Sequence, residues 1–215
     1  VREAVRSCLM GGLLWVMNIF SAESPLVLVV NADNTKGVPN RFRSTKILDH
    51  FTEEKMGLEE LRLSGSGQFS AGSFETLLEC VGHPKNFYVL DLRAEEHGFL
   101  NGVAVSWCGP RNQSNLGMSS AAVVEQEEGR LKGLQGFQEI VVHRIRAKNN
   151  EENQLPTVEA ETWKVTAVES EQQFLARYRI PYFRLAVTDH KRPSDLEVDA
   201  WLAWVQQLPK DRWVH

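Results

Sequence analysis

Residues 87–91, Phe87-Tyr88-Val89-Leu90-Asp91, form a continuous apolar run that ends at an acidic residue. A run of this length is typical of a strand that is buried on both faces. Such strands occur in parallel sheets whose two faces are covered by helices. The run therefore predicts an α/β fold with this strand in its interior.

The C-terminal third of the chain alternates strand and helix. Residues 162–168 and 182–187 predict strands, and a capping box follows each of them and starts a helix: Ser170-Glu171-Gln172-Gln173 and Ser194-Asp195-Leu196-Glu197. The apolar residues of the second helix at helical spacing are Val198, Trp201, Leu202 and Val205. Its tryptophans, Trp201 and Trp204, are expected to serve in core and interface packing. In open α/β sheets, ligands bind at the carboxyl ends of the strands, so the loop at residues 188–193 is the candidate site.

The middle of the chain has a different pattern. Residues 139–145 and 157–168 are β-branched and alternating, and the polar residues 148–154 separate them. This pattern predicts an antiparallel hairpin in a small β-rich, barrel-like insert at about residues 100–168. Further upstream we expect a short strand at residues 61–63, a break at residues 64–67, and a short helix at residues 73–81 that Ser73 caps. Residues 25–31 form either a strand or a linker.

The N-terminus resembles a secretory signal peptide. Arg2 and Arg6 precede an apolar run at residues 8–20, and the small polar residues 21–24 follow it. The run is shorter than the roughly 20 residues that span a bilayer, so a stable membrane anchor is not expected, and a buried N-terminal helix is the alternative. We therefore expect residues 1–24 to be a signal peptide, residues 25–215 to form the domain, and the protein to be secreted or periplasmic. Cys80 and Cys108 either pair or remain free thiols.

Charge argues against two classes of partner. The chain has 24 Lys and Arg against 28 Asp and Glu, which gives a formal net charge of −4. This balance provides no long-range field that would attract nucleic acid or an anionic membrane. Any anion site must therefore be a local cluster. The sequence also shows no His-x3-His or Cys-x2-Cys spacing, so no metal site and no cofactor are predicted.

The loop after residue 187 concentrates chemistry-bearing side chains. Asp189 and His190 follow the predicted strand, and Lys191 and Arg192 precede the next helix. A carboxyl group here can act as a general acid, while the cations and the helix N-terminus can hold a phosphate or another anion. The alternative is that Asp189 only stabilises a turn and that the two cations are solvated.

Several stretches together resemble the protein-tyrosine-phosphatase-like (PTP-like) inositol phosphatases, or phytases. The stretches run from about residue 39 to the end of the chain: Arg43 in residues 39–43, residues 64–70, Asp91-Leu92-Arg93-Ala94-Glu95-Glu96-His97-Gly98-Phe99-Leu100-Asn101-Gly102, Val105-Ser106-Trp107, and Val187-Thr188-Asp189-His190 with Pro193. The resemblance implies a mainly parallel sheet flanked by helices. It also implies hydrolysis of phosphate monoesters, most simply inositol polyphosphates, through a cysteinyl-phosphate intermediate.

The resemblance also assigns roles to individual residues. Asp189 would be the general acid, and the substrate contacts would be Arg43, Lys191, His190, Arg93 and Asp91. Arg93 and Asp91 have a second interpretation as a structural ion pair under the site, and His97 and Glu95 are expected to organise the loop.

The nucleophile of such an enzyme lies in a Cys-x5-Arg loop. Six residues after Cys8, Cys80 and Cys108 stand Leu14, Asn86 and Ser114, so no cysteine of this chain fits that pattern. The chain is therefore expected to be a front portion that is inactive alone. A phosphotyrosine or phosphoinositide phosphatase, or a catalytically inactive binding or structural protein, are the alternatives.

Overall fold

The computed structural model of the protein describes residues 26–31, 36–46, 57–109, 115–146, 157–188 and 191–215. The proposed signal peptide at residues 1–24 lies outside these ranges, so export stays a prediction from the sequence. No helix within the described ranges is both long enough and apolar enough to cross a bilayer.

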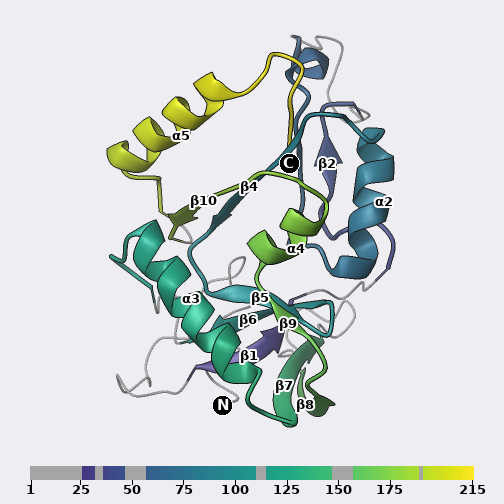
Figure 1. The fold of residues 1–215 in the computed structure, drawn as a ribbon, viewed down its shortest axis with the longest axis vertical. Helices are drawn as coiled ribbons and strands as arrows, with labels where there is room; N and C mark the ends of the chain where they lie inside the picture. The colour runs from purple at the N-terminus through teal and green to yellow at the C-terminus, as the bar shows by residue number, and fades with distance from the viewer. Residues whose placement is uncertain (1–25, 32–35, 47–56, 110–114, 147–156, 189–190) are drawn as a thin grey trace.

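A three-stranded parallel sheet occupies one half of the molecule (Figure 1). Its order is β10 (Tyr182–Val187), β4 (Phe87–Arg93) and β11 (Trp213–Val214). The predicted apolar strand is therefore central, and both of its neighbours run parallel to it. This arrangement confirms the α/β fold.

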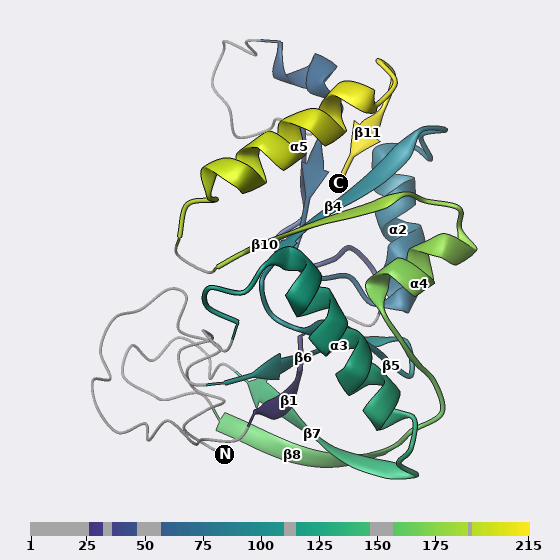
Figure 2. The same ribbon diagram turned by 60° about the vertical axis from the view of Figure 1, so that its left-hand side comes forward.

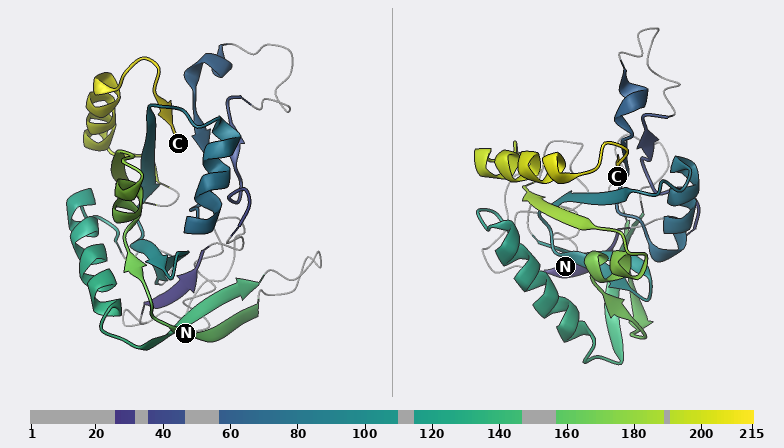
Figure 3. Two further views of the ribbon diagram at one scale, coloured as in Figure 1. Left: turned by 45° about the vertical axis from the view of Figure 1, so that its right-hand side comes forward. Right: turned by 45° about the horizontal axis from the view of Figure 1, so that its top comes forward.

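Different helices cover the two faces of β4, because successive side chains of a strand point to opposite faces. Phe87 and Val89 pack in one core cluster with α2 (Ala71–Val81) and α4 (Glu171–Arg177). Tyr88 instead contacts Trp204 of α5 (Asp195–Gln207). Figure 3 accordingly shows α5 and α2 on opposite sides of β4.

A six-stranded sheet occupies the other half of the molecule. Its order is β8 (Thr157–Lys164), β7 (Glu139–Arg146), β1 (Val27–Val30), β6 (Val103–Cys108), β5 (His97–Leu100) and β9 (Val168–Glu169). The predicted hairpin is β7 with β8, and residues 27–30 form a strand rather than a linker. Among the described strands this sheet is open, so the β-rich region is not closed into a barrel.

No sequence pattern predicts α3 (Ser120–Leu134), which lies inside the region expected to be β-rich. Only a narrow stripe of this helix is buried, and one of its buried residues is the acidic Glu127. Figure 2 shows α3 extending from β10 along the six-stranded sheet. Contact with that sheet is close at Gly98, where an added Cβ atom would lie 2.8 Å from Leu131 Cδ2, so only glycine fits here.

The segment before α2 also differs from expectation. Residues 61–63 do not form the expected strand, since Leu61 is the last residue of the 3-10 helix η1 (Leu58–Leu61). The expected break at residues 64–67 instead contains the short strand β3 (Ser64–Gly65). This strand pairs antiparallel with β2 (Arg43–Ser44) in a two-stranded ribbon. The predicted helix starts earlier than expected, because Ser70 is its N-cap and Ser73 completes the capping box. Cys80 on α2 is a free thiol, so it does not pair with Cys108.

Aromatic rings fill the core between α2, α4 and the two sheets. The ring centroid of Phe174 on α4 lies 4.9 Å from that of Phe99 on β5 and 5.2 Å from that of Phe74 on α2. Since these rings come from three elements, their packing fixes how the elements meet.

Replacement of Phe174 by alanine should therefore destabilise the protein strongly. Phe174 is 1% exposed, and its removal should lower the free energy of unfolding by about 3–5 kcal/mol, measured by urea denaturation. Phe137 is 58% exposed and provides the matched control, since Phe137→Ala should cost much less. Equal losses from the two variants would contradict this core assignment.

Candidate active site

A cavity of about 620 Å³ lies at the carboxyl end of β4, as the α/β pattern predicts. Its lining combines the end of β4, the β2–β3 ribbon, the inner side of α5 and the end of β11. The polar and aromatic residues in that lining are Arg43, Ser64, Ser66, Gln68, Phe69, Asp91, Arg93, Glu171, Trp201, Arg212 and His215.

The structure brings three of the expected site residues together, since Arg43, Asp91 and Arg93 all line this cavity. Lys191 is exposed and is not among the lining residues. Asp189 and His190 lie outside the described residues. The strand that leads to them ends beside the cavity, because Val187 of β10 pairs with Arg93 of β4.

Arg43 and Arg93 present their guanidinium groups differently. Arg93 Nη1 donates to Gln68 Oε1, and Arg93 Nε lies 3.6 Å from Glu95 Oε2. Arg43 is exposed and has no ion pair with any residue that the structure describes. One cation is thus anchored in the cavity wall, while the other is available to a ligand at its edge.

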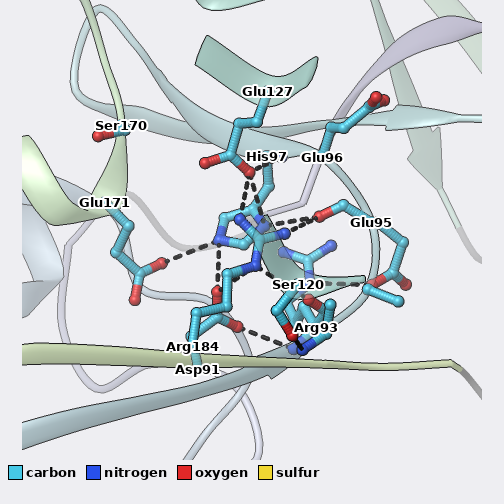
Figure 4. Close-up of polar contacts among 12 residues, drawn as sticks. Asp91, Arg93, Glu95, Glu96, His97, Ser120, Glu127, Ser170, Glu171 and Arg184 are labelled. Atoms are coloured by element: carbon cyan, nitrogen blue, oxygen red, sulfur yellow. Dashed lines mark hydrogen bonds and ion pairs between the residues drawn. The ribbon is translucent and has the colours of Figure 1, made fainter. Parts of the chain in front are cut away.

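A buried imidazole, His97 on β5, lies behind this wall (Figure 4). Its Nε2 atom is 3.2 Å from Asp91 Oδ2 and 3.5 Å from Glu171 Oε2, and its Nδ1 atom is 3.5 Å from Glu127 Oε2. Burial by itself would lower the pKa of His97, but the nearby Asp91 carboxylate outweighs it and raises the pKa to about 10. His97 is therefore a buried cation at neutral pH.

Arg184 on β10 ties the turn after β4 to the neighbouring strand. Its Nη1 atom lies 2.6 Å from Glu127 Oε2, and its Nη2 atom donates to the carbonyl oxygen of Glu95 over 2.7 Å. Its Nε atom donates to the carbonyl oxygen of Arg93 over 3.2 Å. The backbone that carries Arg93 is thus held in place by a charged side chain from β10.

Asp91 is committed to internal contacts. Burial would raise its pKa, but the charges of His97 and Arg184 hold that pKa well below its usual range. One oxygen accepts from the Tyr182 hydroxyl over 2.6 Å, and the other accepts from the Arg93 backbone N–H over 2.9 Å. These contacts favour the interpretation of Asp91 as a support under the site, and a direct contact with substrate stays a prediction.

Glu171 is one of the lining residues that the sequence did not predict. The sequence shows it only as part of a capping box, yet it lines the cavity from the first turn of α4. Burial raises the pKa of Glu171, and the nearby negative charge of Asp91 raises it as well. A hydrogen bond with His97 lowers the pKa but does not cancel this rise. No sequence signal marks Tyr182, Arg184 or Glu127 either, because their partners come from other elements.

His215 lines the cavity from the end of β11. Its imidazole stacks on the rings of Phe42 and Phe87, with centroids 6.3 Å and 6.2 Å away. Burial lowers its pKa to about 4, so this ring is neutral where His97 is charged. Within the described residues, no group of His, Cys, Asp and Glu side chains is arranged to hold a metal ion.

Comparison with known proteins gives consistent matches. Residues 90–215 match the family model PTPlike_phytase, which is described by the words inositol hexakisphosphate. A tandemly repeated PTP-like phytase from Mitsuokella multacida has a similar structure, with a TM-score of 0.78 and 28% identity over 91% of this chain and 34% of its own. A PTP-like phytase from Bdellovibrio bacteriovorus gives a TM-score of 0.64 and 27% identity over 94% of this chain and 66% of its own.

Two further matches concern a ligand complex and a bacterial effector. A PTP-like myo-inositol phosphatase from M. multacida in complex with myo-inositol-(1,3,4,5)-tetrakisphosphate has a TM-score of 0.78 and 27% identity over 92% of this chain. The effector protein hopD2 of Pseudomonas syringae pv. tomato is 27% identical over 160 residues, which are 74% of this chain and 34% of the effector. The chain thus spans about a third of the length of these relatives.

His97 and His215 should respond to pH in opposite directions. With its pKa raised from 6.5 to about 10, His97 should contribute its full stabilisation below pH 6.5 and lose it as the pH rises through about 10. With its pKa lowered from 6.5 to about 4, His215 should contribute fully above pH 6.5 and lose its contribution as the pH falls through about 4.

The measurement is an NMR titration of the imidazole ¹⁵N and ¹³C signals, assigned with His97→Gln and His215→Gln variants. At pH 7, His97 should show the signals of an imidazolium and His215 those of a neutral ring. A neutral His97 or a charged His215 at that pH would overturn the electrostatic description.

Proposed function

The chain belongs to the PTP-like phytase family, whose members are phosphatases, and we propose that it forms part of a phosphomonoesterase that acts on inositol polyphosphates. One observation carries the proposal for this chain. The cavity at the carboxyl end of the parallel sheet is lined by Arg43 and Arg93, on the side where β10 leads toward Asp189.

The charges of this cavity suit a small polyanion. Arginine binds phosphate through a planar fork of N–H donors, so two guanidinium groups from different elements can hold a ligand with several phosphates. Asp91 and Glu171 also line the cavity, but His97 and Arg184 compensate the charge of Asp91, and burial raises the pKa of Glu171. A related M. multacida enzyme binds an inositol tetrakisphosphate, which supports the same substrate class here.

The proposed chemistry has two steps. A cysteine thiolate attacks the phosphorus atom, an S–P bond forms, and the P–O bond to the inositol oxygen breaks while Asp189 gives that oxygen its proton. Water then attacks the phosphorus atom of the cysteinyl-phosphate, and Asp189 accepts a proton from the water. A new P–O bond forms, the S–P bond breaks to regenerate the thiolate, and inorganic phosphate leaves. The thiolate must come from outside these 215 residues, because no cysteine here has an arginine at the sixth following position.

The remaining roles follow from the positions of the side chains. Arg43 and Arg93 would contact phosphate groups of the substrate, and Lys191 and His190 would approach it from the loop before α5. Asp91, His97 and Arg184 would hold the backbone of Arg93 in register with β10, the strand that precedes Asp189 in the sequence.

Replacement of Asp189 by asparagine should remove the transferable proton and keep the size of the side chain. In the full-length enzyme, kcat for inositol hexakisphosphate should fall by roughly 10²- to 10⁴-fold, with a much smaller change in KM. An aryl phosphate with a good leaving group should suffer less, because its phenolate leaves without protonation. Steady-state kinetics on both esters measure the difference.

Asp195→Asn is the matched control, since Asp195 is an exposed acid whose ion-pair partner is the nearby Arg192 at 3.1 Å. It should leave the kinetics of both esters nearly unchanged. If Asp189→Asn lowers the two rates equally, or hardly at all in a folded protein, Asp189 is not the general acid. Glu171, whose pKa is raised by burial at the cavity, is then the next carboxyl group to test.

The 215 residues alone should release no phosphate from inositol hexakisphosphate, because they contain no nucleophile with the required loop. The assay is colorimetric detection of inorganic phosphate with the purified, folded chain. Measurable turnover by this chain would sink the proposed covalent mechanism.

A further inference from the structure

A chain of hydrogen bonds runs through the imidazole of His215 from the central sheet to the β2–β3 ribbon. Trp213 Nε1 donates to Ser64 Oγ over 2.8 Å, and Ser64 Oγ lies 2.8 Å from His215 Nδ1. On the other side of the ring, His215 Nε2 lies 3.0 Å from Ser66 Oγ, which donates to the carbonyl oxygen of Gly67 over 2.6 Å.

The two ends of this chain, together with the neutral state of the His215 imidazole, fix the direction of every bond. The indole N–H can only donate and a carbonyl oxygen can only accept. The Ser66 hydroxyl gives its hydrogen to Gly67, so it must accept a hydrogen from His215 Nε2. The Ser64 hydroxyl accepts from the indole and gives its own hydrogen to His215 Nδ1. All four contacts are therefore hydrogen bonds when the imidazole has its hydrogen on Nε2.

The backbone of His215 is part of the central sheet. Its N–H donates to the carbonyl oxygen of Tyr88 over 2.9 Å, and its carbonyl oxygen accepts from Leu90 N–H over 2.8 Å. The residue therefore belongs by its backbone to the strand region beside β4, while its side chain reaches the loop that contains Ser64 and Ser66.

The β2–β3 ribbon, which this chain of hydrogen bonds connects to the central sheet, contains Arg43. Arg43 pairs with Gly65 and Ser44 with Ser64, and Gly67 N–H donates to the carbonyl oxygen of Asn40 over 2.8 Å. A ribbon with two residues in each strand has little stability of its own. Its position over the cavity must come from contacts with the rest of the fold.

We propose that His215 is a positioning residue, which clamps the β2–β3 ribbon to the central sheet through Ser64 and Ser66. By holding this ribbon, His215 keeps Arg43 at the edge of the cavity. The clamp itself follows from the contacts above. Its consequence for substrate rests on the proposed function, in which Arg43 binds a phosphate group.

The clamp can be tested without any assay of activity, by amide hydrogen exchange in the full-length protein. His215→Phe keeps an aromatic ring but removes both hydrogen bonds, and Ser66→Ala removes one. Each variant should increase exchange about fivefold or more at residues 43–45 and 63–66, with α4 unchanged. His215→Gln keeps one donor and one acceptor and should restore most of the protection.

Ser119→Ala is the matched control for the loss of a hydroxyl, since Ser119 accepts from Ala122 N–H at the start of α3 and has no contact with the ribbon. It should leave exchange at residues 43–45 unchanged. Equal ribbon protection in wild type, Ser66→Ala and His215→Phe would overturn the clamp, as would ¹⁵N shifts that place the imidazole hydrogen on Nδ1.

The functional consequence is tested by a double-mutant cycle with Arg43→Ala. Ser66→Ala should raise KM for inositol hexakisphosphate about threefold to tenfold with little change in kcat, and it should raise KM no further when Arg43 is already alanine. Equal effects in both backgrounds would show that Ser66 does not act through Arg43. If the wild-type protein lacks phosphatase activity, the proposed function fails, while the exchange measurements still decide the clamp.

Discussion

A buried cation, His97, joins the two halves of this molecule. It belongs to β5 of the six-stranded sheet, and its closest acid, Asp91, belongs to β4 of the three-stranded sheet. The acids Glu127 and Glu171 reach the same ring from α3 and α4. Taking charges out of water costs several kcal/mol for each ion, and only well-placed opposite charges offset that cost. The sheets must therefore meet in the one arrangement that brings these partners together, and the backbone turn carrying Arg93 is set by the same contacts.

The sequence predicted those elements whose signals are local. Both capping boxes start helices where expected, residues 182–187 form β10, and the apolar run at residues 87–90 lies in the central strand. Their signals are hydrogen-bonding side chains within one turn, or an apolar run of strand length, so neighbouring residues are enough to define them. The family resemblance identified the PTP-like phytases, and the comparisons confirm that family.

Features that depend on distant partners were not predictable. The α3 helix buries Glu127 because Arg184 and His97 neutralise it, and a sequence pattern counts that acid as a surface residue. The sequence predicts a break where β3 lies, since Ser-Gly-Ser-Gly has no β propensity and the partner of β3, β2, lies about 20 residues upstream. The α5 helix shows the opposite error. Its apolar spacing suggested a core face, yet Trp201 is 38% exposed and Leu202 42% exposed, while Trp204 stacks on Phe183 of the sheet.

The parallel pairing of β11 with β4 also bears on how the protein folds as it is synthesised. Trp213 is 2% exposed within the same core cluster as Phe74 and Phe87. It pairs with Phe87, and more than half of the chain lies between these two residues in the sequence. Contacts so distant along the chain are slow to form, since the entropy of closing the intervening loop is lost before the contact contributes. The six-stranded sheet contains only residues up to Glu169, so it can assemble while the ribosome is still translating the remainder. The central core has to wait until Trp213 has emerged, and until then the side of β4 that receives β11 is an open edge that a chaperone or a neighbouring nascent chain can reach.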